Sequence, residues 1–399
     1  MTQLDDVVIV SAVRTAIGDF GGALRDLQAP DLAAIVMKAA IDRVEIPGLA
    51  SQINDVRFGC CVEDNRFMNV TRIAALRAGI PKEVPAVTIN RVCTSAMEAI
   101  VSGRHQIRSD DTQEIILAGG VESMSTIPYL SYDLRWGHRY FDSKLVDGVM
   151  EGLKAGGDKL MGMTAEILAE EFKLTREELD EVALRSHTNA LNASKSGRFK
   201  DEIIPIELTT RKGLKTFDSD EHPREYTMED LANMKPVFKP KNGVVTSGNS
   251  SGINDGAAAV IIMSQGKSDE LGIKPLAKIV EYGIGGVDPD HMGLGPVPAT
   301  KNLFSKVKDY SLDEVQLIEV NEAFAATYLA TERTLELDRD ITNVNGSGVG
   351  LGHPVGCTGT RIVVTLLHEM QKRHDSLGLA TLCGGGGLGM SLLLSREEG

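Results

Sequence analysis

Basic residues are in short supply in this 399-residue chain. It has 42 lysines and arginines against 56 aspartates and glutamates, a formal net charge of −14. A general nucleic-acid-binding surface needs a basic excess, so this balance argues against that class of protein. It is compatible with an anionic small molecule, because a local basic patch is enough to bind one.

Cysteines are also few, and long apolar runs are missing. The five cysteines are odd in number and have no C-x-x-C spacing, so free thiols in a reducing compartment are expected. No apolar stretch approaches the roughly 18 residues of a membrane span, and the first residues lack the pattern of a signal peptide. The eight histidines show no paired ligand spacing, so no metal site is expected. We therefore predict a cytoplasmic protein without membrane or nucleic-acid partners.

Glycine, by contrast, is abundant at 41 residues, and short apolar runs alternate with helical patterns. Strands are predicted at residues 6–13, 53–59, 84–89, 114–118, 257–263, 277–282, 315–320, 341–344, 379–383 and 390–394. Helices are predicted at residues 31–44, 69–78, 94–107, 164–172, 175–195, 323–335 and 358–371. The alternation predicts an α/β fold with a largely parallel central sheet, in which residues 84–89 form a buried strand.

Four segments of the first part of the chain resemble four later ones in the same order. The pairs begin near residues 6 and 277, 53 and 313, 93 and 353, and 115 and 379, an offset of roughly 255 to 270 residues in each case. This pattern predicts a duplicated α/β unit whose equivalent loops meet at one place. The expected boundaries are 1–121 for the first half, 122–247 for a loop-rich insertion, 248–274 for a return to the first half, and 275–399 for the second half.

Cys93 stands where a predicted strand gives way to a predicted helix. Backbone N–H groups and the positive end of a helix dipole favour a thiolate at such a place, which is how a protein makes a nucleophile from a cysteine. Considered alone, a cysteine in apolar surroundings is more often a small core residue. The rest of the chain has to decide between these two interpretations.

Three further polar residues fall at the equivalent turns. Asn321 is either a helix cap or an amide that orients a water or an oxyanion. His353 is held between Gly352 and Pro354 in a glycine-rich turn, which favours an activating base over a core histidine. Cys383 is either buried in a tight turn or a second thiol for acid–base work, beside glycine N–H groups that line an oxyanion hole.

Nine motifs in order resemble those of the thiolase family, the acyl-CoA C-acetyltransferases. They are V-R-T near the start, the Cys93 segment, A-G-G-V-E-S-M-S, M-G-M-T-A-E, R-F-K-D-E-I, S-G-N-S-S-G-I-N-D-G-A-A-A, N-E-A-F-A, G-H-P-V-G and C-G-G-G-G. The resemblance covers essentially the whole chain. It implies the thiolase fold, in which duplicated βαβαβαββ halves pack as a five-layer α-β-α-β-α core with a loop-rich insertion. It also implies an acyltransferase that cleaves a 3-oxoacyl-CoA with coenzyme A or runs the reverse Claisen condensation.

The resemblance also implies catalytic roles. Cys93 corresponds to the nucleophile that takes the acyl group as a thioester, and His353 to the base that activates it. Cys383 corresponds to the acid–base thiol. Asn321 would hold a water in one oxyanion hole with His353, and the N–H groups of Cys93 and Gly385 would form the second.

Binding roles follow in the same way. Ser251 matches a residue near the pantetheine arm of coenzyme A, and Arg224 a basic residue near its nucleotide end. Leu160, Met161 and Phe324 match positions around the acyl pocket. Coenzyme A is implied as a substrate, with no permanently bound cofactor and no metal. A homodimer or homotetramer is implied, and an unlike accessory subunit stays open.

Two residues depart from the family's usual pattern. Leu160 stands where many short-chain members have a histidine, and Ala96 replaces the glycine of C-x-S-G. An apolar residue near the acyl site predicts a longer, branched or aromatic 3-oxoacyl-CoA, with acetoacetyl-CoA as the alternative substrate.

Other classes compete with a thiolase. A ketosynthase-like condensing enzyme usually lacks the second cysteine, so Cys383 speaks against it. A non-catalytic acyl-CoA-binding subunit is disfavoured because Cys93 and His353 are both kept. The glycine spacing of residues 346–361 does not match the G-x-G-x-x-G fingerprint of nicotinamide dehydrogenases.

Overall fold

The computed structural model describes residues 6–154, 159–211 and 213–396. The main strands of its central sheet are β1 (Val7–Thr15), β3 (Asp55–Gly59), β4 (Ala86–Ile89), β5 (Ile115–Ser123), β11 (Asn254–Ser264), β12 (Ala277–Gly286), β13 (Leu317–Val320), β14 (Leu377–Gly384) and β15 (Leu388–Ser395). Its helices are α1 (Ala29–Asp42), α2 (Val70–Arg77), α3 (Ser95–Ser109), α4 (Gly148–Gly152), α5 (Met161–Glu171), α6 (Arg176–Lys195), α7 (Met228–Ala232), α8 (Gln265–Leu271), α9 (Pro296–Lys306), α10 (Ala325–Leu335), α11 (Gly348–Leu351) and α12 (Thr358–Arg373). The predicted α/β class is confirmed.

One mixed sheet joins these strands in the order β13-β14-β15-β12-β1-β11-β5-β3-β4. The order β12-β15-β14-β13 in the second half mirrors β1-β11-β5-β3 in the first. The halves meet where Val8 and Ile9 of β1 pair with Lys278 and Ala277 of β12. Segments that resemble each other in sequence therefore occupy equivalent places in the sheet.

The prediction of a largely parallel sheet is wrong. Among the strands in this order, β3 runs parallel to β4 and β5, and β13 runs parallel to β14. The pairs β1–β11, β11–β5, β12–β15 and β14–β15 are antiparallel. β14 turns directly into β15, and a tight turn can join only antiparallel strands. β11 enters the sheet only after a long insertion, so no short connection sets its direction.

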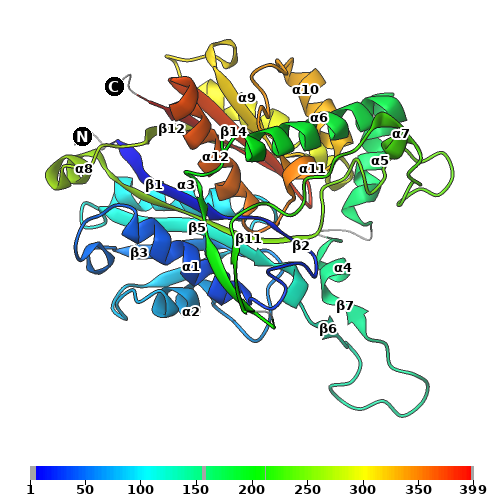
Figure 1. The fold of residues 1–399 in the computed structure, drawn as a ribbon, viewed down its shortest axis with the longest axis horizontal. Coiled ribbons are helices and arrows are strands. Elements are labelled where there is room, and N and C mark those ends of the chain that lie inside the picture. Colours follow the sequence, from blue (N-terminus) through cyan, green and yellow to red (C-terminus); the bar gives the residue numbers. More distant parts are fainter. Residues whose placement is uncertain (1–5, 155–158, 212, 397–399) are drawn as a thin grey trace.

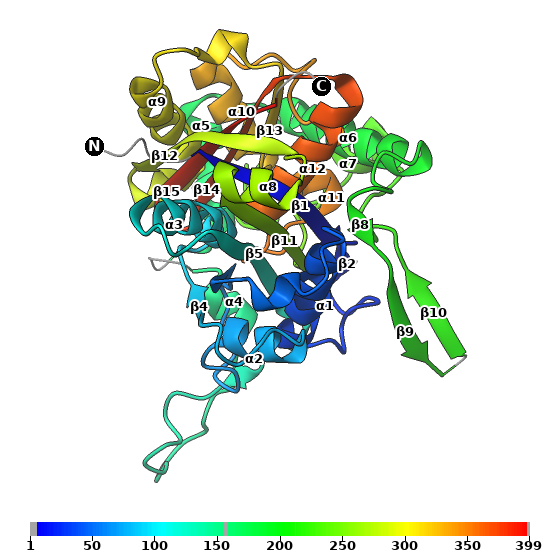
Figure 2. The same ribbon diagram turned by 90° about the vertical axis from the view of Figure 1, so that its left-hand side faces the viewer.

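The helices form three layers around the two halves of the sheet. α3 and α12 pack against each other in the middle, between the strands of both halves (Figure 1). Met97 and Ile100 of α3 share an apolar cluster with Ile362 and Leu366 of α12 and with residues of β5, β11, β14 and β15. α1 and α2 cover the outer side of the first half, and α9 and α10 the outer side of the second (Figure 2). This is the expected α-β-α-β-α order.

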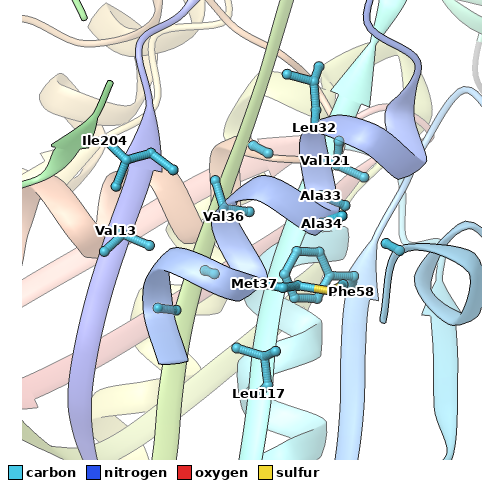
Figure 3. Packing of buried hydrophobic residues seen from close by; sticks show 14 of the residues in the cluster. Val13, Leu32, Ala33, Ala34, Val36, Met37, Phe58, Leu117, Val121 and Ile204 are labelled. Carbon is cyan, nitrogen blue, oxygen red and sulfur yellow. The ribbon is translucent and has the colours of Figure 1, made fainter. Parts of the chain in front are cut away.

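The outer core of the first half shows why α1 forms where it does. Its apolar face points at the sheet, so that Val36 and Met37 pack over Phe58 of β3 and Leu117 of β5 (Figure 3). Pro30 stands in the first turn of the helix, where a backbone N–H would have no intrahelical acceptor, so its absence costs no hydrogen bond.

Two predicted strands differ from the structure. β4 is half-exposed rather than buried, with Val87 at 37% exposure, because it is the last strand of the sheet and has a neighbour on one side only. Residues 341–344 do not form a strand in the described chain. A single bridge joins Thr342 to Ile318, because β13 has only four residues to offer as a partner.

Between β5 and β11 the chain leaves the sheet, except where β8 (Ile203–Ile204) pairs with the end of β1. This insertion holds α4 to α7, β8 and the short strands β6 (Tyr129–Leu130), β7 (Val146–Asp147), β9 (Ile206–Thr210) and β10 (Gly213–Phe217). α6 begins with a capping box, in which Thr175 and Glu178 each bond the other's backbone N–H. The segment between β6 and β7 and the β9–β10 hairpin both extend away from the body (Figures 1 and 2). α5 and α6 pack on α10 and α11 and carry the insertion over the second half.

Candidate active site

Cys93 lies in the turn between β4 and α3, as predicted from the sequence. The turn is fixed by Ser95, whose hydroxyl accepts from the N–H of Arg91 at 2.8 Å and donates to the carbonyl of Val92 at 2.5 Å. Val92 has a φ of 50°, in the left-handed region that a β-branched residue rarely adopts. The residue before the thiol is thus strained, which is a common property of functional turns.

The start of α3 is packed closely against glycines of both halves. A Cβ atom on Gly59 would lie 2.5 Å from the nitrogen of Ala96, and one on Gly120 would lie 2.5 Å from the Cβ of Ala96. A Cβ atom on Gly359 of α12 would lie 2.4 Å from the nitrogen of Met97. These distances are too short for a side chain, so the glycines allow the two central helices to begin side by side.

The Cys93 sulfur is buried, and burial raises the pKa of its thiol to about 11. The N–H groups of Gly385 and of Cys93 itself donate to the sulfur and oppose this rise, whereas the charge of Glu122 adds to it. The sequence led us to expect a favoured thiolate at this position. The two N–H groups act in the expected direction, but in the free protein desolvation outweighs them.

His353 is held by Thr358, the first residue of α12. The Thr358 hydroxyl donates to the carbonyl of Pro354 at 2.9 Å, so its oxygen accepts from Nδ1–H of His353, 2.7 Å away. This leaves Nε2 as the nitrogen with a free electron pair. Burial and then the charge of Arg361 lower the pKa of His353 to about 3, so the imidazole is neutral at ordinary pH. Thr358 was not singled out from the sequence, because a threonine at a helix start has no distinctive signal.

Asn321 follows β13 and is buried. Its Nδ2 lies 3.5 Å from Nε2 of His353, and its backbone N–H donates to the carbonyl of Thr381 at 3.0 Å. Its Oδ1 has no hydrogen-bond partner among the described residues. The predicted pairing of Asn321 with His353 is therefore present in the geometry, with one amide oxygen still to be satisfied.

Cys383 lies near the end of β14 and pairs with Gly389 of β15. Burial raises the pKa of its thiol to about 12, the charge of Cys93 adds to the rise, and its own N–H opposes it. The chain then turns through Gly386 and Gly387, which have φ values of 81° and 86°. This turn places the N–H of Gly385 at the Cys93 sulfur.

These groups share one cavity of about 450 Å³. Cys93, His353, Cys383 and Gly385 line it, together with Ser251 and with the predicted pocket residues Leu160, Met161 and Phe324. The lining also includes residues that the sequence did not reveal, namely Met124, Met150, Leu153, Gly162, His222, Val237, Phe238, Thr246, Ser247, Ser250, Gly252, Ile253, Met292, Ala323 and Val355. Most of the newly found side chains come from irregular segments, where no periodicity marks the inward face.

Two predicted site residues, Arg224 and Asn321, are not among the residues that line the cavity. The guanidinium of Arg224 is 46% exposed and pairs with Asp19. His222, two residues earlier, does line the cavity, and its Nδ1 lies 2.8 Å from Oδ1 of Asp19. The hydrogen bond from His222 is the main cause that lowers the pKa of Asp19 to about 2. An imidazole and a guanidinium are thus held together by one carboxylate at this end of the site.

The described residues contain no cluster of three or more His, Cys, Asp or Glu side chains arranged to hold a metal ion. Within the same residues, no helix is both long and apolar enough to cross a bilayer. All five cysteines are described, and each is a free thiol.

Two thiols and a neutral imidazole at one apolar cavity, in a duplicated α/β fold, are the arrangement of cysteine-dependent acyltransferases. Family models match the chain along most of its length, the thiolase N-terminal domain at residues 7–266 and the thiolase C-terminal domain at residues 273–396. The chain therefore belongs to the thiolase family and is an acyltransferase.

Individual relatives agree with this assignment. The chain is 48% identical over 395 residues to an acetyl-CoA acetyltransferase of Syntrophomonas wolfei, covering 98% of each. It is 44% identical over 394 residues to the beta-ketothiolase BktB of Cupriavidus necator, covering 98% of this chain and 99% of the relative. Its fold matches the acetyl-CoA acetyltransferase of Bacillus anthracis with a TM-score of 0.96 at 48% identity, covering 99% of this chain and 100% of the other. It matches human mitochondrial 3-ketoacyl-CoA thiolase in complex with CoA with a TM-score of 0.94 at 41% identity, covering 99% and 98%.

Proposed function

We propose that the chain cleaves a 3-oxoacyl-CoA with coenzyme A, or runs the reverse Claisen condensation, through a thioester on Cys93. The observation that supports this most is the convergence of Cys93, His353, Cys383 and the N–H of Gly385 on one end of the cavity. Each of them supplies a group that the reaction needs: a nucleophile, a base, an acid and an oxyanion donor.

In the first half of the reaction, Nε2 of His353 takes the proton of Cys93 as its sulfur attacks the 3-oxo carbon. The N–H groups of Cys93 and Gly385 bind the oxyanion that forms. The bond between carbons 2 and 3 then breaks and leaves the shortened acyl group on Cys93, and the Cys383 thiol protonates the departing carbanion to give acetyl-CoA. Because both Cys93 and His353 are neutral beforehand, the proton moves with the attack rather than before it.

In the second half, the Cys383 thiolate takes the proton of a coenzyme A thiol, which attacks the acyl group on Cys93. The Cys93 thiolate leaves and recovers its proton from the imidazolium of His353. Earlier, while the bond between carbons 2 and 3 breaks in the first half, Asn321 and Nε2 of His353 would hold a water that donates to the thioester oxygen of the substrate, where negative charge develops.

The acyl pocket supports a substrate bulkier than acetoacetyl-CoA. Leu160 sits at the start of α5 and lines the cavity with Met150, Leu153, Met161 and Met292, and these side chains offer apolar and adaptable contacts to a longer or branched chain. The alternative is acetoacetyl-CoA itself, which is favoured by the names of the acetyl-CoA acetyltransferase relatives.

Coenzyme A is proposed as a substrate that enters past Ser251 and Arg224, with no permanently bound cofactor. The N–H of Ser251 is occupied by the carbonyl of Ala323, so its side chain rather than its backbone faces the ligand. We further propose a cytoplasmic homodimer or homotetramer whose contacts include the insertion, and a role in degradation resembling β-oxidation. An unlike accessory subunit is not required by any of these steps.

The test is a CoA-dependent cleavage assay on a panel of 3-oxoacyl-CoA thioesters that runs from acetoacetyl to long, branched and aromatic acyl groups. The expected result is activity that is highest on a bulky substrate and is lost in Cys93→Ala. Leu160→His should then shift kcat/KM toward acetoacetyl-CoA by about tenfold. A wild-type preference for acetoacetyl-CoA would establish the alternative substrate, and an inactive wild type would reject the thiolase reaction.

A further inference from the structure

Glu122, at the end of β5, is a buried carboxylate whose partners are N–H groups rather than basic side chains. Its Oε2 accepts from the N–H of Cys61 at 3.0 Å, of Val62 at 3.2 Å and of Gly356 at 2.9 Å. Its Oε1 lies 3.7 Å from the sulfur of Cys60. The side chain has no exposed surface, so these groups replace its water shell. Its role in the A-G-G-V-E-S-M-S segment is not used by any of the steps above.

The carboxylate joins two segments that come from different halves of the chain. Cys61 and Val62 belong to the loop that follows β3 in the first half, whereas Gly356 belongs to the turn between His353 and α12 in the second. The fit at the second segment is close. A Cβ atom on Gly356 would lie 2.7 Å from Oε2 of Glu122, and one on Gly120 would lie 2.1 Å from the carbonyl oxygen of Gly356. The turn that carries His353 therefore rests directly on the end of β5.

The same carboxylate faces several thiols. Cys60 and Cys61 approach it from the loop after β3, Cys93 from the start of α3 and Cys357 from the start of α12. Its negative charge acts to raise the pKa of each of them, and Glu63 acts in the same direction on the first two. Among these carboxylates, the charge of Glu122 is the one that raises the pKa of Cys93.

We propose that Glu122 is a positioning residue for the acyl-transfer reaction, which fixes the His353 turn against the Cys60–Val62 loop and keeps a negative charge near Cys93. This inference rests on the roles proposed above for His353 and Cys93. The fixed turn sets the position of Nε2 of His353 for the proton transfer. Burial is the main reason why Cys93 stays protonated before the substrate arrives, and the Glu122 charge, present above a carboxyl pKa that burial raises to about 7, adds to this protection against other electrophiles.

Two substitutions separate the geometry from the charge. Glu122→Gln can place its oxygen where Oε2 stands and its NH₂ group toward the Cys60 sulfur, so the three N–H bonds to Oε2 persist without the charge and only the longer contact from Val62 N–H to Oε1, 3.3 Å, is lost. Glu122→Asp keeps the charge but withdraws the carboxylate from the three N–H groups. Glu166 of α5 offers a matched control, because it is also buried and accepts from the N–H groups of Val244 and Val245.

The experiment measures the pH dependence of iodoacetamide alkylation of Cys93 by peptide mass spectrometry, beside kcat, KM and Tm. Glu122→Gln should lower the midpoint of Cys93 alkylation by about half a pH unit or more, because it removes a repelling charge. Glu122→Asp should lower kcat about tenfold, with KM changed less than about twofold, because it moves the base and not the binding surface. Glu166→Gln should change Tm without moving the alkylation midpoint.

Either of two results would overturn the proposal: an unchanged alkylation midpoint in Glu122→Gln, or a Glu122→Asp enzyme that loses only thermal stability. If Glu122→Asp does not fold, the alkylation profile of Glu122→Gln still decides the matter. The alkylation arm needs no substrate. A wild type that cleaves no thioester would therefore count against the proposed function, and a flat alkylation comparison would count against this inference alone.

Discussion

Each half of the molecule delivers one thiol to the cavity, and the two are held in different ways. Cys93 of the first half lies at the start of a helix, where the N–H groups of Gly385 and of Cys93 itself reach its sulfur. Cys383 of the second half lies inside a strand, where only its own N–H offsets burial, and the charge of Cys93 acts on it as well. A duplicated fold thus yields two thiols of unequal acidity, because one half ends its strand before the cysteine and the other after it.

The largest expected effect comes from removing the more acidic thiol. Cys93→Ala should lower kcat for thioester cleavage by about 10⁴-fold or more, since the acyl group loses its carrier. Intact-protein mass spectrometry after mixing with an acyl-CoA should show no acyl adduct. Cys357→Ala is the matched control, because Cys357 is a buried thiol outside the cavity lining. An adduct in Cys93→Ala would assign the acyl group to another residue.

A smaller effect is expected at the second thiol. Cys383→Ser should lower kcat by about 10³-fold, because a serine hydroxyl is a far poorer proton donor and acceptor at neutral pH. The acyl adduct on Cys93 should still form from an acyl-CoA and should persist, which the same mass measurement detects. Failure of this variant to acylate would contradict the assignment by showing that Cys383 is needed for the first acyl transfer as well.

The support of His353 is expected to matter less than either thiol. Thr358→Val removes the acceptor for Nδ1–H, so both tautomer and ring orientation lose their constraint, and kcat should fall by about 10- to 100-fold with little change in KM. Thr365→Val is the matched control on the same helix, since Thr365 is buried and donates to Glu202. Equal losses of kcat in both variants would indicate a general effect on α12.

The smallest effect concerns the free enzyme and its pH dependence. The thiolate is the reactive form, so raising the pH should increase alkylation of both cysteines about tenfold per unit below their pKa values. With pKa values raised to about 11 for Cys93 and about 12 for Cys383, Cys93 should react about tenfold faster across this range. Rates measured between pH 6 and about pH 10 check this. A plateau near neutral pH would instead show a preformed thiolate–imidazolium pair.

Much of the site could be predicted because its residues stand at the ends of strands or in the turn before a helix. Cys93 and Asn321 follow strands, Cys383 lies near the end of one, and His353 stands in the turn before α12; the repeat in the sequence places these segments together. Sequence reasoning missed Glu122 and Thr358, because a glutamate at a strand end and a threonine at a helix start are common in any protein. Their importance comes from hydrogen bonds that the sequence does not show: Glu122 accepts from N–H groups distant in the chain, and Thr358 accepts from the imidazole of His353.

The errors in the fold have a related cause. Residues 84–89 have the apolar composition of a core strand, and composition cannot tell the last strand of a sheet from an inner one. The acidity of Cys93 was misjudged because the sequence shows the helix start but not the burial around it. Sheet direction was misjudged because the partner of β1 arrives more than 200 residues later, as β11.

That late arrival has a consequence for how the chain is made. β11 lies between β1 and β5, so on the ribosome the first half lacks its middle strand until residue 264 has been synthesised. Until then, β1 and β5 each present an open edge of unpaired N–H and C=O groups, which invites pairing with other nascent chains. The order of elements along the gene therefore makes translation, rather than the finished enzyme, the stage at which this protein is most exposed to aggregation.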